Sequence, residues 1–264
     1  MVEIHAHRAG PLSDGIAVHA EQTLPAFART WSQHRVVCEL DVRFTADGVA
    51  VVFHDPDLTR MTGARGQLHE LDAAAFEALR TDILGTGRRL ALASEPVPFA
   101  TLEEVLRLAR HHRGDLNVEL KNLPGEPWFD ATEATAERLA TILRGSRIAP
   151  QRLTVQTFWD PDLAVFRRLL PGVRRSLLVE PGAEAHGAER ALLAGAGAVG
   201  LAWPVSPGTV RRAHDRGVRV MAYTLNEPAA IRDAWRAGVD VIITDDPSVA
   251  QRTLAALPSL AAAV

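Results

Sequence analysis

Short apolar runs alternate with longer amphipathic segments along most of this chain. The apolar runs are rich in Val, Ile and Leu, which is typical of buried strands, and the segments between them repeat apolar residues every three or four positions, as helices do. We predict strands at 2–7, 36–44, 49–54, 115–121, 152–158, 173–179, 198–203, 218–225 and 239–244. We predict helices at 23–34, 101–112, 131–144, 161–170, 186–195, 207–216, 227–237 and 247–256. This alternation indicates a parallel sheet covered by helices.

The third predicted strand differs from the others in its connection. Only residues 45–48 separate it from the second strand, and they end in Asp47-Gly48, which favours a tight hairpin turn. A parallel crossover needs about a dozen residues or more, so 49–54 must run antiparallel to 36–44 as a β-ribbon. The eight remaining strands, each with a following helix, predict an α/β protein with the (β/α)8 fold, a TIM barrel.

The length of the chain agrees with one such barrel, so we expect a single barrel domain over residues 1–264. Segment 58–98 lacks strong periodicity apart from a short helix expected at 72–80. We interpret the region of about 45–98 as a ribbon and small insertion, or lid, after the second barrel strand. The alternative architecture is an open doubly wound sheet, but no G-x-G-x-x-G turn follows the first strand, which favours the barrel.

Acidic residues lie near the ends of two predicted barrel strands. Glu39 and Asp41 are two positions apart in one strand, as are Glu119 and Lys121 in another, so each pair points to one face. Buried carboxylates are costly without a positively charged partner. Three convergent oxygen ligands suit Mg²⁺ or Ca²⁺ better than Zn²⁺, with Mn²⁺ as a third candidate. The alternative is that the carboxylates only pair with neighbouring cationic side chains, namely Arg8, Arg43 and Lys121.

Two histidines fall beside this acidic cluster. His7 ends the first strand, and the ribbon returns His54 to the level of Asp41. Active sites of TIM barrels lie at the C-terminal ends of the strands, so we expect both histidines to share one site with the carboxylates. Histidine donates and accepts protons near neutral pH, as a phosphodiester displacement requires. A solvated surface position is the alternative for any one of the ten histidines.

Other residues near the expected site carry charge or aromatic surface. Arg8 and Lys121 could hold a phosphate, or they could only neutralise the carboxylates. Trp203 and Tyr223 lie at or near the ends of later strands, where they could wall the pocket or pack as ordinary rim residues. The two roles are compatible, so the pattern alone leaves open whether Arg8 and Lys121 bind a phosphate.

Composition and charge narrow the classes of function. A formal net charge of −3 gives no electrostatic case for binding nucleic acid or an anionic membrane. Cys38 is the only cysteine, so an internal disulfide is impossible. The N-terminus has no secretory pattern, and no apolar run approaches the length of a membrane span. We expect a cytoplasmic protein with a small-molecule substrate, without nucleic-acid partners or integral membrane association, and of unknown oligomeric state.

Several short motifs follow one another along nearly the whole chain. They are His-Arg-Ala-Gly at 7–10, Glu-Gln-Thr-Leu-Pro-Ala-Phe at 21–27, Glu-Leu-Asp-Val at 39–42, Val-Phe-His-Asp at 52–55, Thr-Leu-Glu-Glu-Val-Leu at 101–106, Val-Glu-Leu-Lys at 118–121, Thr-Leu-Asn at 224–226 and Ile-Thr-Asp-Asp-Pro at 243–247. Each motif is weak alone, but the ordered set resembles the glycerophosphodiester phosphodiesterase family.

That resemblance implies a phosphodiesterase barrel of glycerol and lipid metabolism, which hydrolyses a glycerophosphodiester to sn-glycerol 3-phosphate and an alcohol. By resemblance, His7 and His54 would be the acid/base pair, and Arg8 would contact the phosphate. The metal ligands would be Glu39, Asp41 and Glu119. The first attack would come either from the glycerol 2-hydroxyl, through a cyclic phosphate, or directly from water. The sequence leaves this choice open.

Two further functions stay open on sequence grounds. The same barrel could act on lysophospholipids as a lysophospholipase D, which a long apolar groove in segment 58–98 would favour and a small polar pocket would oppose. It could also be a non-catalytic barrel that binds phosphodiesters.

The chain departs from the family pattern where Ala9 separates Arg8 from Gly10, where Gln22 replaces the usual Asn, and where Met61 replaces a common Thr.

Overall fold

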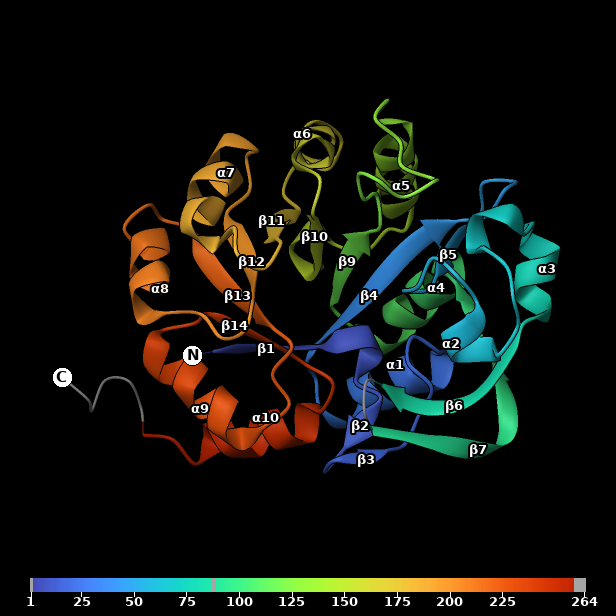
Figure 1. Ribbon diagram of the computed structural model, residues 1–264, viewed down its shortest axis with the longest axis horizontal. Helices are drawn as coiled ribbons and strands as arrows, with labels where there is room; N and C mark the ends of the chain where they lie inside the picture. The colour runs from blue at the N-terminus through green and yellow to red at the C-terminus, as the bar shows by residue number, and fades with distance from the viewer. Residues whose placement is uncertain (1, 87–88, 259–264) are drawn as a thin grey trace.

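Eight parallel strands form a closed barrel in the computed structural model, which describes residues 2–86 and 89–258. In chain order these strands are β1 (Glu3–Ala6), β4 (Val37–Phe44), β9 (Leu116–Leu120), β10 (Leu153–Thr157), β11 (Arg174–Val179), β12 (Ala198–Ala202), β13 (Arg219–Tyr223) and β14 (Val241–Thr244). Each pairs with its neighbours in chain order, and β1 pairs with both β4 and β14, which closes the sheet. The predicted TIM barrel is confirmed, and Figure 1 shows its helices arranged around the strands.

A helix follows each barrel strand. In chain order the helices are α1 (Leu24–Gln33), α4 (Leu102–His112), α5 (Ala134–Gly145), α6 (Asp160–Leu169), α7 (Gly187–Leu193), α8 (Pro207–His214), α9 (Pro228–Ala237) and α10 (Pro247–Ala255). Short 3-10 turns lie at His7–Ala9, Leu68–Glu70, Pro150–Arg152 and Glu184–His186. Within the described ranges, no helix combines the length and the apolar character that crossing a membrane requires.

Helix α5 begins at Ala134, later than the predicted position 131. Asp130 explains the difference. Its carboxylate accepts hydrogen bonds from the backbone N–H groups of Thr132 and Thr135, each at 2.7 Å. These bonds hold the residues before the helix in a loop, because an aspartate side chain competes with helical backbone hydrogen bonds.

Strand β4 shows how the sequence positions charged residues inside the barrel. Cys38, Leu40 and Val42 point outward and are fully buried in the main hydrophobic core. Glu39 and Asp41 alternate with them and point inward. Burying one leucine side chain stabilises the fold by about 1.5–3 kcal/mol, so the apolar face fixes which residues point outward. A shift of one residue would move both carboxylates into the apolar layer.

The predicted β-ribbon is present at the end of β4. Strand β5 (Ala50–Val52) runs antiparallel to β4, with Val42 opposite Val52. Gly48 in the turn has φ 85°, a left-handed conformation that favours glycine. The ribbon brings the chain back to the barrel, since the backbone N–H of Phe53 donates to the carbonyl of Asp41 at 3.1 Å.

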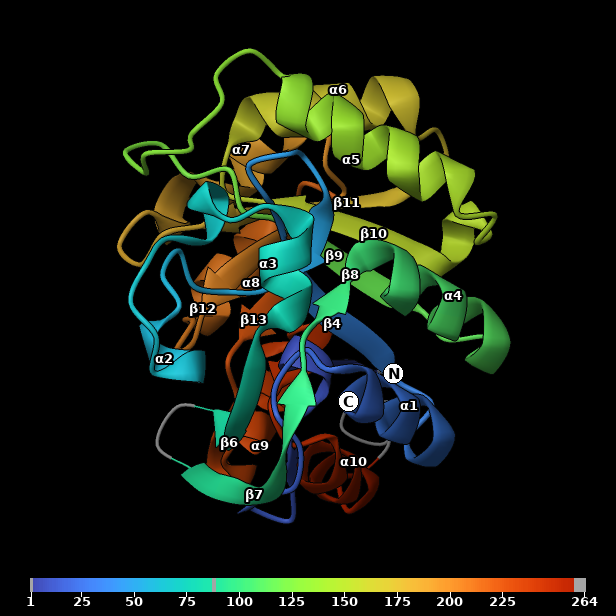
Figure 2. The same cartoon turned by 90° about the vertical axis from the view of Figure 1, so that its right-hand side faces the viewer.

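The residues between β5 and α4 form a group of small elements beside the barrel. These elements are α2 (Thr59–Thr62), α3 (Ala73–Ala78), β6 (Arg80–Thr86), β7 (Arg89–Pro98) and β8 (Ala100–Thr101). Figure 2 turns this group toward the viewer. It has a second hydrophobic core that includes Met61 and Phe76. The short helix expected at 72–80 is present as α3, with the Asp72 side chain as its N-cap.

The antiparallel pair β6 and β7 was not expected in this segment. Leu90 and Leu92 on β7 are exposed, so the strand lacks the alternation of buried and exposed positions that marks a strand in sequence. The pair contacts the loop after β1, which holds the hairpin of β2 (Leu12–Ser13) and β3 (Ile16–Ala17). In that loop the carbonyl of His19 accepts from the N–H of Gly85 at 2.7 Å. The insertion therefore packs on the segment that leads into α1.

Candidate active site

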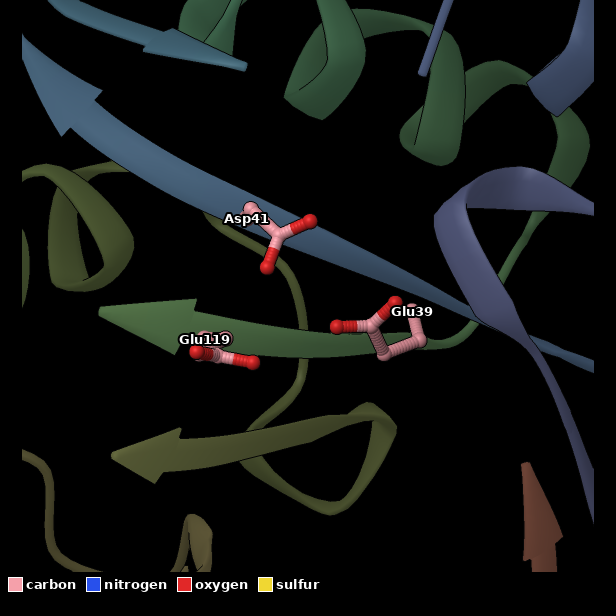
Figure 3. A group of neighbouring side chains, drawn as sticks. All are labelled: Glu39, Asp41 and Glu119. Atoms are coloured by element: carbon pink, nitrogen blue, oxygen red, sulfur yellow. The ribbon is translucent and has the colours of Figure 1, made fainter. Parts of the chain in front are cut away.

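Three carboxylates converge inside the barrel. Glu39 and Asp41 project from β4 and Glu119 from β9, where Asp41 and Glu119 are register partners, and Figure 3 shows their carboxylates turned toward one space. One oxygen of each lies within 4.8 Å of the others. Their exposed fractions are only 1%, 1% and 5%. Like charges this close and this buried are strongly unfavourable without positive charge among them.

Lys121 supplies part of that positive charge. Its Nζ lies 2.8 Å from Asp41 Oδ1 and 2.6 Å from Glu119 Oε1. Burial lowers the pKa of Lys121, but the two carboxylates raise it more, so its ammonium group keeps its proton. Burial likewise raises the pKa of Asp41, but Lys121 and other cations bring it well below its usual value. Lys121 is thus shared by two carboxylates, its single positive charge offsets only one of their two negative charges, and its contact with phosphate stays a prediction.

Glu39 is held by neutral donors instead. The backbone N–H of Arg8 donates to Glu39 Oε2 at 2.9 Å, and Gln156 Nε2 donates to Oε1 at 3.2 Å. Burial, and then the charge of Asp41, raise the pKa of Glu39 to about 8. With only the protein's own charges present, the Glu39 carboxyl therefore keeps a proton at neutral pH. A divalent cation among the three carboxylates would replace that proton, so the residues fit a hard, oxygen-binding cation such as Mg²⁺ or Ca²⁺.

Two glutamines fix the orientation of these carboxylates. Gln22 Nε2 donates to Asp41 Oδ2 at 2.7 Å, and Gln22 Oε1 accepts from the backbone N–H of Asp41 at 2.8 Å. Gln156, which donates to Glu39, itself accepts from Asn117 Nδ2 at 2.8 Å. Gln22 stands where the resembled family has Asn, and both ends of its amide are used here. Amides behind a set of ligands commonly change metal affinity about 10- to 100-fold.

His7 is oriented by an aspartate from the end of β14. His7 Nδ1 lies 2.7 Å from Asp245 Oδ1. The other oxygen of Asp245 accepts from Asn226 Nδ2, and the Asp245 backbone N–H donates to Asn226 Oδ1 at 2.8 Å. Burial lowers the pKa of His7, but the charge and hydrogen bond of Asp245 raise it, and the net pKa lies above its usual value. The surroundings of His7 therefore stabilise its protonated form.

His54 has a similar partner but different surroundings. Its Nδ1 lies 2.7 Å from Asp55 Oδ1, and Asp55 Oδ2 accepts from Arg60 Nε at 2.5 Å. Burial and the charge of Lys121 lower the pKa of His54 to about 4. The imidazole is therefore neutral near pH 7, and Nδ1 carries the hydrogen that the carboxylate accepts, which leaves Nε2 as an acceptor. Arg43 Nε donates to the His54 carbonyl at 2.9 Å and fixes the backbone there.

Arg8 lies between the carboxylate triad and a fourth carboxylate, Glu21. Its Nη1 is 3.0 and 3.2 Å from the two oxygens of Glu21, and its Nε is 3.8 Å from Asp41 Oδ2. Arg8 and Ala9 have φ angles of 48° and 67°. Such left-handed conformations cost non-glycine residues roughly 1–2 kcal/mol each. This turn places the Arg8 N–H against Glu39. Ala9, which separates Arg8 from Gly10 and so departs from the family pattern, is fully buried in the same turn.

Most of the expected site residues, though not Asp41 or Trp203, line one cavity of about 180 Å³. Those on its wall are His7, Arg8, Glu39, His54, Glu119, Lys121 and Tyr223. The rest of the wall includes the apolar side chains Phe158, Leu178 and Ile243. Tyr223 donates its hydroxyl to the carbonyl of Val179 at 3.1 Å. Trp203 is half-buried and packs against the barrel core instead.

Sequence reasoning did not identify the residues that hold the site residues in place. Asn226 and Asp245 lie in the quoted motifs at 224–226 and 243–247, yet no role followed from the motifs. No sequence pattern indicates a role for Arg60 or Gln156. A chemical argument could have pointed to the aspartates: a catalytic histidine needs a carboxylate or carbonyl on its second ring nitrogen to fix its tautomer.

Comparisons with known proteins point to one family. The sequence model of the glycerophosphoryl diester phosphodiesterase family matches residues 7–249. A glycerophosphodiester phosphodiesterase from Caldanaerobacter subterraneus is 26% identical over 227 residues, which cover 86% of this chain and 89% of the relative. A mouse lysophospholipase D is 24% identical over 285 residues, which cover 96% of this chain and 82% of that protein.

Solved structures give the same result for the fold. The crystal structure of a protein from Silicibacter pomeroyi, assigned as a glycerophosphoryl diester phosphodiesterase, has a TM-score of 0.82 and 28% identity to this chain. The match covers 97% of this chain and 93% of that one. The barrel and its insertion are thus shared over nearly the full length of both chains.

Proposed function

Because this chain belongs to the glycerophosphoryl diester phosphodiesterase family, we propose that it cleaves a glycerophosphodiester to sn-glycerol 3-phosphate and an alcohol. It is a phosphoric diester hydrolase. The observation that carries the proposal is that two histidines, each hydrogen-bonded to an aspartate, line one cavity together with two members of a buried carboxylate triad, Glu39 and Glu119. This reaction needs a proton acceptor, a proton donor and positive charge around the phosphate. The cavity has residues suited to each task.

In this proposal Glu39, Asp41 and Glu119 hold a divalent cation, Mg²⁺ or Ca²⁺ with Mn²⁺ as a third candidate. Such a cation, when bound, supplies positive charge and orientation for oxygens of the substrate. Lys121 keeps its proton between two carboxylates and adds fixed charge next to the phosphate. Arg8 lines the same cavity and contacts the phosphate with its guanidinium group.

The two histidines are suited to opposite steps of proton transfer. His54 is neutral above about pH 4, so its Nε2 accepts the proton of the attacking hydroxyl. His7 is protonated more readily than a free histidine, so it donates a proton to the oxygen of the leaving alcohol. The attacking hydroxyl belongs to water or to the glycerol C2 position. In the second case a cyclic phosphate forms, and water opens it with the roles of the two histidines reversed.

The function is tested by following release of sn-glycerol 3-phosphate from a panel of glycerophosphodiesters with choline, ethanolamine, glycerol or inositol as the alcohol. We expect release with Mg²⁺, Ca²⁺ or Mn²⁺, loss of release in excess EDTA, and recovery when the cation is returned. No release from any member of the panel would contradict the proposed function. Full activity in EDTA would contradict the role of the metal.

Metal binding is tested separately by calorimetric titration of the metal-free protein with each cation. Glu39→Gln should weaken binding by at least about tenfold, because it removes an anionic oxygen ligand. Glu103→Gln is the matched control, since the Glu103 side chain is 82% exposed on α4. Equal affinity of the Glu39 and Glu103 variants would show that the triad does not hold the cation.

A lysophospholipase D activity is the second candidate, because a relative bears that name. A lysophospholipid adds a long acyl chain that needs an apolar groove. The cavity of about 180 Å³ combines ionisable residues with apolar ones, and its small volume favours a small substrate over one with a long acyl chain. Choline release from lysophosphatidylcholine, measured beside glycerophosphocholine, separates the two candidates. We expect glycerophosphocholine to be hydrolysed faster than lysophosphatidylcholine.

A further inference from the structure

Arg60, from the insertion, bridges two parts of the site. Its Nε lies 2.5 Å from Asp55 Oδ2, and Asp55 is the carboxylate that orients His54. Its Nη2 and Nη1 lie 2.6 and 3.0 Å from the two oxygens of Glu21. Glu21 also accepts from Arg8 Nη1. One guanidinium group thus connects the histidine that accepts a proton with the arginine that faces the phosphate.

Glu21 shows what the second arginine does for Arg8. Its side chain is 3% exposed, and its carboxylate lies between the two guanidinium groups. Burial raises the pKa of Glu21, but Arg8 and Arg60 lower it below its usual value, so the group is ionised. If Arg8 were its only partner, the full negative charge would be held against Arg8. Sharing the charge with Arg60 leaves more of the positive charge of Arg8 for a phosphate.

Asp55 shows what the same arginine does for His54. Arg60 occupies Oδ2 of Asp55, which leaves Oδ1 for the ring Nδ1 of His54. A carboxylate with one oxygen held by a guanidinium cannot rotate freely, so the ring keeps one orientation. His54 lines the cavity in that orientation. The planar fork of arginine is needed for this task, because Arg60 places three separate nitrogens on Asp55 Oδ2 and on the two oxygens of Glu21, whereas lysine has a single nitrogen.

The second hydrophobic core holds Arg60 at this place. Helix α2 is only four residues long, but Leu58 and Met61 on either side of Arg60 are buried in that core. The Met61 sulfur lies 3.1 Å from Arg60 Nη1, so the residue that departs from the family pattern contacts this guanidinium. The Arg60 side chain is 35% exposed. Its position therefore depends on these contacts rather than on complete burial.

We propose that Arg60 is a positioning residue that acts through Asp55 and Glu21 to align His54 and Arg8 on the substrate phosphate. The inference rests on the proposed function for the roles of His54 and Arg8. It makes the insertion a working part of the active site rather than only a cover over the barrel.

The kinetic test compares Arg60→Met with the wild-type protein. We expect kcat on the best glycerophosphodiester to fall about 10- to 100-fold, because small displacements of reacting groups have effects of this size. Arg60→Lys should recover part of the loss, since it restores the charge but not the fork. Arg80→Met is the matched control, because Arg80 lies in the same insertion and, among the residues that the structure describes, donates only to the backbone carbonyls of Glu77 and Leu79. It should keep wild-type kcat.

A double variant separates positioning from a general loss of structure. If Arg60 acts partly through His54, then Arg60→Met should lower kcat less in the His54→Ala protein than in the wild type. An equal effect in both backgrounds would overturn the inference. Thermal unfolding monitors folding of each variant, and Arg60→Gln takes the place of the Met variant if that protein does not fold.

A readout without substrate distinguishes this inference from the proposed function. NMR of the 15N-labelled imidazole rings should show the His54 Nδ1 proton protected from exchange by its bond to Asp55 in the wild type and in Arg80→Met. The protection should be lost in Arg60→Met. An unchanged His54 signal in Arg60→Met would overturn the positioning role even in an active enzyme. Absence of hydrolysis by the wild type would contradict the proposed function and leave the NMR result to decide on Arg60.

Discussion

The two histidine–aspartate pairs share one hydrogen-bond geometry but differ in what supports the aspartate. In each pair Nδ1 lies 2.7 Å from a carboxylate oxygen. The aspartate of His7 is bonded to a neutral amide, Asn226. The aspartate of His54 is paired with a cation, Arg60. The same histidine–aspartate hydrogen bond therefore lies in different electrostatic surroundings in the two pairs.

The two rings also differ in proton affinity, and the causes lie in the burial and the charges around each ring. Burial lowers the pKa of both, but for His7 the Asp245 carboxylate outweighs burial, and the net pKa is raised. For His54 the charge of Lys121 adds to burial, and the pKa falls to about 4. The comparison teaches that a histidine–aspartate pair does not determine by itself whether the ring acts as acid or base. Burial and the other charges around the ring decide this, with Lys121 the main cation that lowers the pKa of His54.

The pairs also come from different parts of the fold. His7 and Asp245 lie at the ends of neighbouring barrel strands, β1 and β14, so the barrel itself fixes their distance. His54 and Asp55 follow the ribbon, and their cationic partner comes from the insertion. The barrel-borne pair should therefore tolerate changes in the insertion that disturb the other pair.

Removing either ring tests the opposite roles and should have the largest effect. His7→Ala and His54→Ala should each lower kcat on a glycerophosphodiester about 10²- to 10⁴-fold, the usual contribution of a positioned acid or base. A substrate that releases p-nitrophenolate needs no proton on its leaving group. On this substrate His7→Ala should recover most of its activity, and His54→Ala should not, as followed by absorbance.

The exposed histidine at the end of α4 provides the control for these variants. His111→Ala should hydrolyse both substrates at the wild-type rate. Recovery by His54→Ala alone would reverse the assignment of acid and base. Recovery by neither variant would mean that leaving-group protonation is not the task of either ring.

Replacing the aspartates should have the next largest effect and should move opposite limbs of the pH profile. His7 must be protonated, so activity falls as pH rises through its pKa. His54 must be neutral, so activity falls as pH drops toward its pKa of about 4. Asp245→Asn removes a charge that raises the pKa of His7, so the alkaline limb should move to lower pH. Asp55→Asn should move the acid limb to lower pH.

The size of these shifts follows from the bonds that are lost. A hydrogen bond to a charged group contributes about 1.5–3 kcal/mol, which corresponds to roughly one to two pKa units. Profiles of kcat against pH measure each shift, and kcat should also fall because the ring is less well oriented. Movement of the same limb in both variants would show that the two pairs do not have separate roles.

The barrel and the triad could be predicted because both follow from local pattern. Strand alternation alone places Glu39 and Asp41 on one face, and the Asp47-Gly48 turn returns His54 to the barrel. The supporting contacts could not be predicted in this way, because they join distant positions. His7 and Asp245 are 238 residues apart in the sequence, and Gln156 and Glu39 are 117 apart. Contacts at such separations produce no repeating pattern of residues in the sequence.

The pair β6 and β7 could not be predicted for a different reason. Its strands form a two-stranded sheet of their own, and β7 is exposed along most of its length. Burial on one face is what produces alternation in a sequence, so an exposed strand carries no such pattern. The insertion that supports His54 is thus the part of the fold least visible in the sequence, whereas the barrel that supports His7 is the most visible.

Asn226 gives the smallest expected effect and the finest test of the comparison. Asn226→Ala removes hydrogen bonds to Asp245 but no charge, so the pKa of His7 should change little and the alkaline limb should stay in place. A hydrogen bond to an ionised carboxylate contributes about 1.5–3 kcal/mol, but Asn226 does not contact the ring, so only part of that loss reaches His7 and kcat should fall roughly 2- to 12-fold. Asn226→Asp is the counterpart, because a second carboxylate beside Asp245 should raise the pKa of His7 and move the alkaline limb to higher pH. If Asn226→Ala moves the alkaline limb as far as Asn226→Asp does, then the orientation of Asp245 rather than charge sets the proton affinity of His7. The contrast between the His7–Asp245 pair and the His54–Asp55 pair would then not be electrostatic.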